Sequence, residues 1–249
     1  MNAFNEYLKI VTDNLVLLAD EQQNHIKQVA EKLTGVIAND GIIYLFGCGH
    51  SHIFGEDVFY RAGGLAPVRP ILIEPLMLHQ GAARSSQLEK QDNYIDKHLQ
   101  EYPITSNDAL IVISTSGINP APIDAILWGK SAGATTIAIT SFLYAEKFPS
   151  RHLSGKYLRD YADMAIDNHV PCGDAVLTVD KNQPPFAPVS SVLGIFLLQA
   201  IFAQVISNLS HRHLPLPVFL SGNIPGSTEH NIRLVNHYSL RIPELSKGL

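Results

Sequence analysis

Two short polar clusters hold the residue types in this chain that are best suited to binding an anion. The first, Gly47-Cys48-Gly49-His50-Ser51, follows the apolar run 42–46, and the second, Ser114-Thr115-Ser116-Gly117, follows the apolar run 109–113. Hydroxyl and backbone N–H groups at a helix N-terminus hold phosphate well, because the helix dipole is positive there. Three hydroxyls in a row without an arginine suit a phosphate ester held by neutral donors. Either cluster alone is explained as an ordinary helix cap, but two of them predict a small phosphorylated ligand.

The first cluster does not match the better-known glycine motifs. A dinucleotide fingerprint needs a glycine where His52 stands, and the next glycine is Gly55. A Walker loop needs Gly-Lys-Ser or Gly-Lys-Thr, and a nucleophile elbow needs a glycine where Ile53 stands. The sequence therefore disfavours nucleotide binding and serine hydrolysis, and we expect no cofactor.

The elements that must position the two clusters alternate between apolar runs and helical patterns. Buried strands are predicted at 42–46, 68–73, 109–113 and 135–140, with helices at 51–62 and 120–132. This β-α-β-α-β order predicts an α/β fold with a parallel, doubly wound sheet, in which Pro70 marks an edge strand. Further short strands are expected at 164–166 and 175–179, a polar helix at 86–99 and an apolar helix at 192–209.

We expect the 249 residues to form a single domain with no clear linker. An N-terminal helical segment, 1–37, contains one or two helices, which either pack on their own domain or carry part of a subunit interface. The sheet core follows at 38–210. A C-terminal tail, 211–249, contains a helix from Thr228 and contributes to the site or to an interface.

Composition and charge exclude several classes of function. The net charge of −5 gives no basic surface for nucleic acid. No basic-then-apolar leader is present, and no apolar run approaches the roughly 18 residues that span a bilayer, so we expect no membrane partner. Cys48 lies inside the first cluster, which makes a disulfide with Cys172 improbable. Two free thiols favour a reducing compartment and a cytoplasmic protein.

The pairing of the two clusters resembles the sugar isomerase (SIS) domain family over about residues 35–210. In that family the second loop usually reads S-x-S-G-x-T, and Asn119 stands here in the threonine position. The departure is mild, because an amide also donates hydrogen bonds. The resemblance implies a three-layer α-β-α sandwich around a mainly parallel five-stranded sheet, and a homodimer or homotetramer with sites near subunit boundaries. It also implies a phosphorylated sugar as ligand, with the phosphate on Ser114, Thr115, Ser116 and Asn119 and the sugar beside Gly49, His50 and Ser51.

The reaction follows less directly from the resemblance than the ligand does. Aldose–ketose isomerisation needs a base that moves a proton between adjacent carbons. Glu229 and His230 form the first candidate catalytic pair, because they follow a glycine-rich loop and open a predicted helix, although Glu229 also suits a helix dipole. Glu74 and His79, after the second predicted strand, form the alternative pair. Glu56 is a third candidate, in the helix after the first cluster.

The preferred reading is an aldose–ketose isomerase of a sugar phosphate or amino-sugar phosphate. A non-catalytic phosphosugar sensor and an etherase-type lyase on an amino-sugar phosphate remain as alternatives. A Glu or His opposite the two phosphate loops would favour an enzyme, whereas an apolar or open pocket would favour a sensor. No metal is expected: phosphoheptose isomerases of this family that bind zinc use a His and a Glu where this chain has Asp57 and Arg61, and His169 beside Cys172 is a weak signal.

Overall fold

The computed structural model describes residues 2–248, within which five strands form one sheet of entirely parallel pairings. The strands are β1 (Ile43–Gly47), β2 (Val68–Ile71), β3 (Ala109–Ile113), β4 (Thr135–Thr140) and β5 (Met164–Asp167). Their order is β2-β1-β3-β4-β5, so that the chain winds in one direction from β1 to β2 and in the other from β3 to β5. The predicted parallel α/β sheet is confirmed, and the strand that contains Pro70 lies at an edge.

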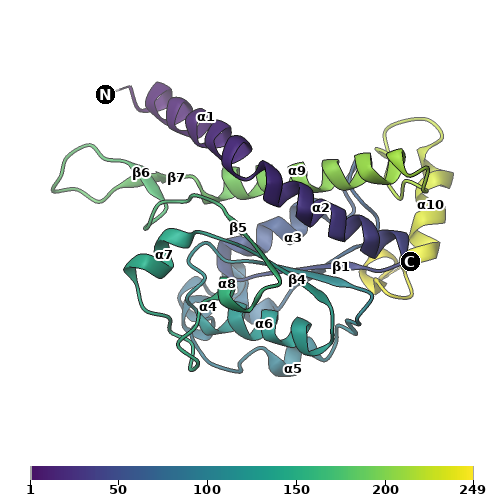
Figure 1. Cartoon of the computed structure of the whole chain (residues 1–249), viewed down its shortest axis with the longest axis horizontal. Helices are drawn as coiled ribbons and strands as arrows, with labels where there is room; N and C mark the ends of the chain where they lie inside the picture. The colour runs from purple at the N-terminus through teal and green to yellow at the C-terminus, as the bar shows by residue number, and fades with distance from the viewer. Residues whose placement is uncertain (1, 249) are drawn as a thin grey trace.

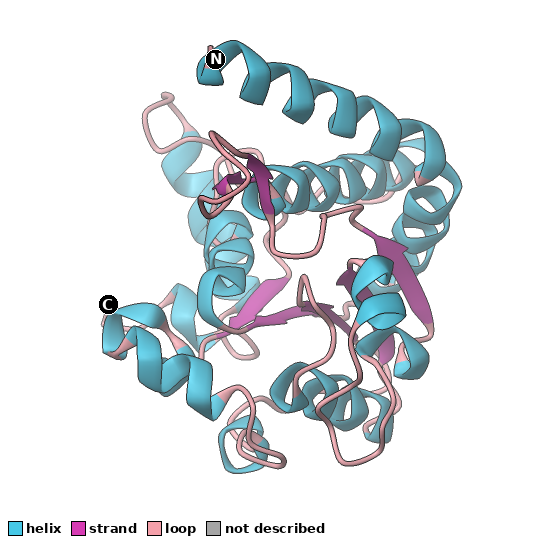
Figure 2. Cartoon of the chain, turned by 90° about the vertical axis from the view of Figure 1, so that its left-hand side faces the viewer, coloured by secondary structure: helices cyan, strands magenta, loops and turns pink. Residues whose placement is uncertain are grey.

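Helices cover both faces of the sheet, which gives the expected α-β-α sandwich (Figures 1 and 2). Alternate residues of β1 point to opposite faces: Ile43 and Leu45 lie in one core, and Tyr44 and Phe46 in the other. The first core is closed by α2 (Gln23–Ala38), α3 (His52–Val58) and α9 (Ser190–His211). The second is closed by α5 (Asp96–Leu99), α6 (Pro120–Ser131), α8 (Leu158–Tyr161) and α10 (Ser227–Tyr238).

The N-terminal segment forms two helices. Helix α1 (Ala3–Glu21) ends one residue before α2 begins, and it extends from the body of the molecule in Figure 1. The hydroxyl of Tyr7 donates a hydrogen bond of 2.8 Å to the carbonyl of Pro188, in a ribbon of β6 (Ala175–Leu177) and β7 (Phe186–Pro188). This ribbon is antiparallel and separate from the main sheet. The strand predicted at 175–179 is therefore observed, but it is shorter than predicted and lies outside the main sheet.

Two predicted helices differ from the observed ones. A 3₁₀ turn, η1 (Gly49–Ser51), precedes α3, and α3 ends at Val58 because Phe59 is extended and Tyr60 adopts a left-handed conformation. The predicted polar helix at 86–99 is instead two short helices. The segment after β2 contains η2 (Glu74–Leu76), η3 (Leu78–Gln80), α4 (Ala82–Leu88) and then α5.

Helix α9 is the most apolar helix, and within residues 2–248 it alone is long and apolar enough to cross a membrane, with a mean hydropathy of 1.9. Its position in the fold explains this composition. Leu197, Ile201 and Val205 are fully buried between the sheet and α2. We therefore assign α9 as the core helix of a soluble domain.

The C-terminal tail packs at the amino end of the sheet, shown in yellow in Figure 1. Arg241 donates two hydrogen bonds, of 2.8 and 2.7 Å, to the carboxylate of Asp108, the residue that precedes β3. Arg69 of β2 pairs similarly with Glu244, in the 3₁₀ turn η4 (Pro243–Leu245). These contacts fix the tail on the far side of the sheet from the loops that follow β1 and β3.

Candidate functional site

A polar cavity of about 280 Å³ lies at the carboxyl end of the sheet. The segments that follow all five strands contribute to its walls. They supply Cys48 and Ser51 after β1, Glu89 after β2, Ser114, Thr115, Ser116 and Asn119 after β3, Tyr144 after β4, and Gly173 and Asp174 after β5. The winding direction reverses between β1 and β3, and doubly wound sheets bind their ligands at such a switch point. The two sequence clusters therefore meet where the fold favours a ligand.

The first loop depends on two glycines. A Cβ atom on Gly47 would lie 2.5 Å from the carbonyl oxygen of Ser51, so the turn closes only around a glycine. Gly49 has a φ of +56°, which favours glycine as well. The backbone N–H of Ser51 already donates to the carbonyl of Cys48, at 2.9 Å. The N–H of Ser51 is therefore not open to a ligand, which differs from the sequence-based expectation, and the loop contributes Cys48 and Ser51 to the cavity wall.

The second loop presents its hydroxyls more openly. The N–H of Gly117 donates to the hydroxyl of Ser114 at 3.2 Å, which folds the loop back on itself. Gly117 has a φ of +61°, and a Cβ there would lie 2.5 Å from the hydroxyl oxygen of Thr140. The hydroxyls of Thr115 and Ser116 have no hydrogen-bond partner among residues 2–248 and line the cavity half-buried. They are the best-placed donors for an anion.

Prolines shape the helix that follows. Helix α6 begins with Pro120 and has Pro122 two residues later, and neither has an N–H group. The N–H between them, on Ala121, donates to the carbonyl of Glu89 at 3.1 Å. The first turn of α6 therefore has few N–H groups for a ligand. Its positive dipole still favours a negative group at Asn119, the cap residue that lines the cavity.

Asn119 is engaged in a chain of hydrogen bonds. Its amide Nδ2 donates to Oε1 of Glu89 at 2.7 Å, and its Oδ1 accepts from Nη1 of Arg151 at 2.9 Å. The sequence-based role of Asn119 was to hold the phosphate directly. In this arrangement one of the two amide N–H donors is used by Glu89, so Asn119 orients that carboxylate and keeps its second N–H for a ligand.

Burial controls the protonation of Glu89 and Cys48. Desolvation raises the pKa of the Glu89 carboxyl, an effect opposed by the hydrogen bond from Asn119 and the charges of Lys90 and Arg151. Burial, with the nearby charge of Glu89, raises the pKa of the Cys48 thiol well above its usual value. Cys48 is thus a neutral thiol in the wall, whereas Glu89 is a carboxyl group that can exchange a proton.

Sequence reasoning missed Glu89 and Tyr144. Glu89 lies in a polar segment without a motif, and its only sequence signal is that it follows a predicted parallel strand, where ligands bind. Tyr144, on α7 (Phe142–Lys147), accepts a 2.8 Å hydrogen bond from the N–H of Gly173 and joins the segments after β4 and β5.

A second cavity, of about 310 Å³, lies on the other side of the first loop. Gly49, His50, His52, Glu56 and His79 line it, together with Ile53, Met77, Leu78 and Ser191. Ser51 of the first loop therefore lines the polar cavity, whereas His50 of the same loop lines the second cavity. Of the alternative pair, His79 reaches this second cavity, whereas Glu74 is exposed and lines neither.

Glu229 and His230 lie at the opposite end of the single chain. Nε2 of His230 is 2.8 Å from the carbonyl oxygen of Val218, which bridges to Leu65 just before β2. Glu229 is exposed. In Figure 1, α10 is on the right, whereas α7 and the β6–β7 ribbon are on the left. The fold of one chain therefore does not bring this pair to the polar cavity.

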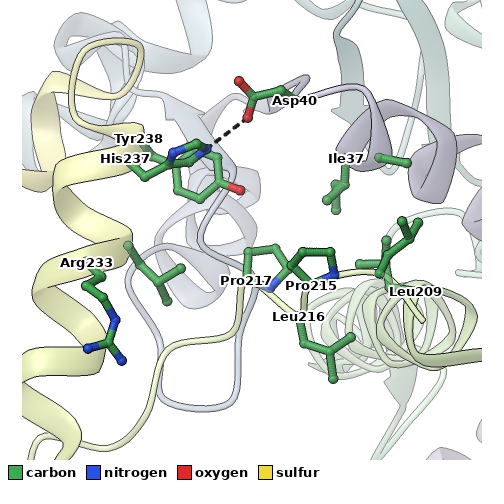
Figure 3. Close-up of a pocket in the computed structure, with 12 residues that line it drawn as sticks. Ile37, Asp40, Leu209, Pro215, Leu216, Pro217, Arg233, His237 and Tyr238 are labelled. Atoms are coloured by element: carbon green, nitrogen blue, oxygen red, sulfur yellow. Dashed lines mark hydrogen bonds and ion pairs between the residues drawn. The ribbon is translucent and has the colours of Figure 1, made fainter. Parts of the chain in front are cut away.

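The later turns of α10 line a different cavity, of about 450 Å³, which Figure 3 shows. Its lining is mostly apolar, with Leu209, Leu216 and Pro217 on one side. Its most prominent polar pair is His237 and Asp40, which contact each other at 3.0 Å. No hydroxyl cluster faces this cavity, so it does not offer the chemistry of the polar cavity.

Histidines and acidic groups do not gather into a metal centre in the part of the chain that the structure describes. No three His, Cys, Asp or Glu side chains among residues 2–248 are placed to hold one ion. His169 instead contacts the carboxylates of Glu21 and Asp167, at 3.1 and 3.3 Å.

The fold and the cavity define a doubly wound α/β protein with a polar cavity at its switch point. A family model described as "SIS domain" matches residues 6–141, more than half of the chain, and the chain belongs to this family. A UPF0309 protein of Halalkalibacterium halodurans is 50% identical over 240 residues, which cover 96% of each chain. A UPF0309 protein of Geobacillus thermodenitrificans is 47% identical over 244 residues, or 98% of each chain.

Solved structures of more distant proteins share the fold. The phosphoheptose isomerase of Neisseria gonorrhoeae matches with a TM-score of 0.55 and 17% identity, covering 82% of this chain and 97% of that one. The phosphoheptose isomerase of Francisella tularensis matches with a TM-score of 0.52 and 15% identity, covering 82% and 96%. These likenesses support the three-layer architecture around a parallel sheet.

Proposed function

We propose that the chain binds a phosphorylated sugar in the polar cavity and catalyses its aldose–ketose isomerisation. One observation carries the proposal: a half-buried carboxyl group, Glu89, shares a single cavity with the hydroxyls of Ser51, Thr115 and Ser116. The hydroxyls suit the phosphate, and the carboxyl suits proton transfer. A convergent carboxylate opposite the phosphate loops is the feature expected of an enzyme rather than of a sensor.

The proposed reaction assigns each group a role. The phosphate binds the hydroxyls of the second loop, helped by the dipole of α6. The Glu89 carboxylate removes the proton from the carbon next to the carbonyl, the carbonyl oxygen takes a proton from water, and an enediol forms. Glu89 then gives its proton to the former carbonyl carbon, and the hydroxyl on the other carbon loses its proton to water and becomes the new carbonyl. Its raised pKa brings the carboxyl closer to neutral pH, where such a base works best.

An etherase-type lyase is the second candidate, because the same carboxylate could remove a proton before a substituent leaves a neighbouring carbon. Two proteins of similar structure are phosphoheptose isomerases, which favours isomerisation. In that subclass the zinc ligands stand at the positions that Asp57 and Arg61 occupy here. Asp57 lies on α3 and Arg61 follows this helix, and the two side chains form an ion pair. We therefore propose a metal-independent reaction.

The assembly and location of the protein are further parts of the proposal. Phe4, Leu8 and Val16 on α1 are 75%, 54% and 65% exposed, so we expect a homodimer or homotetramer that covers them. Glu229 and His230 can take part in catalysis only if a second copy brings them to the cavity, and their role stays a prediction of that kind. Free Cys48 and Cys172 favour the cytoplasm. We expect no nucleic-acid or membrane partner.

A thermal-shift screen tests the ligand. We expect glucose 6-phosphate, fructose 6-phosphate or an N-acetylated relative to raise the melting temperature by about 5–10 °C at a hundredfold excess over its Kd. The parent free sugars should give no shift. Ser116→Ala should abolish the shift, whereas Ser131→Ala, on the exposed side of α6, should retain it. No shift with any phosphosugar, from folded protein, would contradict the proposal.

A further inference from the structure

The second cavity shares a wall with the polar cavity. The loop of residues 48–52 separates them: Cys48 and Ser51 line the polar cavity, whereas Gly49 and His52 line the second. Each cavity alone, at about 280 and 310 Å³, is near the lower limit of roughly 300 Å³ for small-molecule sites. The two cavities lie on either side of one loop.

His52 lines the second cavity and has a ring nitrogen without a hydrogen-bond partner in the described chain. The side chain is only 5% exposed, and its Nδ1 lies 3.2 Å from the carbonyl oxygen of Gly49. A carbonyl only accepts, so Nδ1 carries the hydrogen and Nε2 presents a lone pair. Nε2 is buried and has no partner in the described chain. A buried polar atom without a partner is costly, so this position favours a ligand that donates a hydrogen bond.

The electrostatics of His52 favour an uncharged group. Burial, with the nearby charge of His79, lowers the pKa of the His52 imidazole, which keeps it neutral at pH 7. The histidines His50 and His79 and the carboxylate of Glu56 stand at the exposed rim. These groups form no metal centre in the region that the structure describes.

The remaining wall is apolar. Ile53, Met77 and Leu78 contribute side chains from α3 and from the segment after β2, and Ser191 adds a hydroxyl from α9. An N–H donor to His52 beside a small apolar group would match this lining. An acetamido substituent has both, whereas a hydroxyl or an ammonium group lacks the apolar part.

We propose that the second cavity is a subsite for an acylamino substituent, so that the ligand is an N-acylated amino-sugar phosphate. The inference rests on the proposed phosphosugar ligand and is independent of the reaction. It specifies the substituent that the sugar carries. The phosphate is expected, as before, at the hydroxyls of Thr115 and Ser116.

Calorimetric titration with four probes tests the subsite: N-acetylglucosamine 6-phosphate, glucosamine 6-phosphate, glucose 6-phosphate and inorganic phosphate. One hydrogen bond and one buried methyl group should make the N-acetyl compound bind about tenfold more tightly than the other two sugar phosphates. His52→Phe and Leu78→Trp should each reduce this preference to about twofold or less. Both should leave the affinity for glucose 6-phosphate unchanged.

The matched control is His98→Phe. His98 also has a buried Nε2 without a partner, but it lies in α5 and lines neither cavity. The His98→Phe variant should retain the full preference for the N-acetyl compound. Leu78→Trp keeps the test informative if His52→Phe does not fold, because it fills the cavity and leaves the histidine in place.

The outcomes separate the subsite from the proposed function. Similar affinities for all three sugar phosphates in the wild-type protein would overturn the subsite and leave the phosphate site intact. No binding of any sugar phosphate or of inorganic phosphate would overturn the proposed function as well. A preference that appears only when Zn²⁺ is added, and disappears with chelator, would assign the histidines to a metal and refute the acylamino subsite.

Discussion

Glu89 differs from Asp174, the other carboxylate of the cavity, in how its oxygens are bonded. Oδ1 of Asp174 accepts the N–H groups of Val189 and Ser190, and its Oδ2 accepts the Ser190 hydroxyl at 2.7 Å. Glu89 has only Oε1 engaged, by Asn119, among the residues described. Asp174 therefore holds the start of α9 in place, whereas Glu89 has an oxygen left for a substrate.

Replacing Glu89 with glutamine should stabilise the folded protein and abolish the proposed isomerisation. The folded state holds the Glu89 proton more tightly than the unfolded state, because burial raises this pKa. Stability linked to this group is therefore greatest below the unfolded pKa, near pH 4.5, and is lost as the pH rises through the folded pKa. Glu89→Gln has no charge to desolvate, and its amide oxygen can still accept from Asn119.

Thermal melts of wild type and Glu89→Gln across the pH range measure this effect. The variant should melt higher than wild type at pH 7, and the difference should shrink to nothing below about pH 4. A lower melting temperature for the variant at pH 7 would show that the charged carboxylate is a net stabilising group. It would also remove the argument for its raised pKa.

The predicted residues that line the polar cavity are those that stand next to a clear sequence pattern. Ser51, Ser114, Thr115 and Ser116 stand directly after apolar strands, in short loops whose position follows from the strands. Glu89 stands 18 residues after the end of β2, at the end of α4. Its place depends on how the segment between them folds back, and neither periodicity nor spacing defines that path.

The loop after β3 depends on one backbone conformation more than on any side chain. Gly117→Ala introduces a Cβ 2.5 Å from the Thr140 hydroxyl, at a φ of +61°. The loop must shift, so we expect loss of the ligand-induced thermal shift and a destabilisation of about 1–3 kcal/mol. Gly155→Ala is the matched control, because Gly155 has a φ of +69° but no atom within 4 Å of the new Cβ.

The control should lose stability through backbone strain alone and keep its response to sugar phosphate. Differential scanning fluorimetry with and without the best ligand compares the two variants. An unchanged ligand shift in Gly117→Ala would mean that this loop does not shape the phosphate site.

At the scale of elements, the strands were predictable and the helix ends were not. Runs such as 109–113 are apolar throughout, because a parallel sheet buries both faces. The observed β3 has these bounds, and β1 is shifted by one residue. Helix α3 ends early because of Tyr60 and its left-handed backbone, which no pattern in the sequence indicates.

At the scale of the whole molecule, the contacts that hold the C-terminal tail lie at the amino end of the sheet, whereas the ligand is expected at the carboxyl end. Asp108 is fully buried, and Arg241 of the tail bonds to both of its oxygens. Asp108 also accepts the N–H groups of Ile42 and Thr105. The tail is therefore bound to the core by a charge pair whose carboxylate is buried.

Arg241→Ala should destabilise the protein by about 2–3 kcal/mol, because it leaves the buried carboxylate of Asp108 without its cation. Urea denaturation measures the change. Arg212→Ala is the matched control, because Arg212 pairs with Glu31 on the surface and should cost less than about 1 kcal/mol. Neither variant should alter the affinity for sugar phosphate. A weakened affinity in Arg241→Ala alone would link the tail to the site.

Proton exchange between substrate carbon and solvent tests the central assignment of Glu89 most directly. The sugar phosphate that gives the strongest thermal shift is incubated with enzyme in D₂O, and deuterium at the carbon next to the carbonyl is followed by NMR. Wild type should incorporate deuterium, and Glu89→Gln should do so at least about a hundredfold more slowly while it still binds the ligand. Undiminished incorporation by Glu89→Gln would contradict the account and assign proton transfer to another residue.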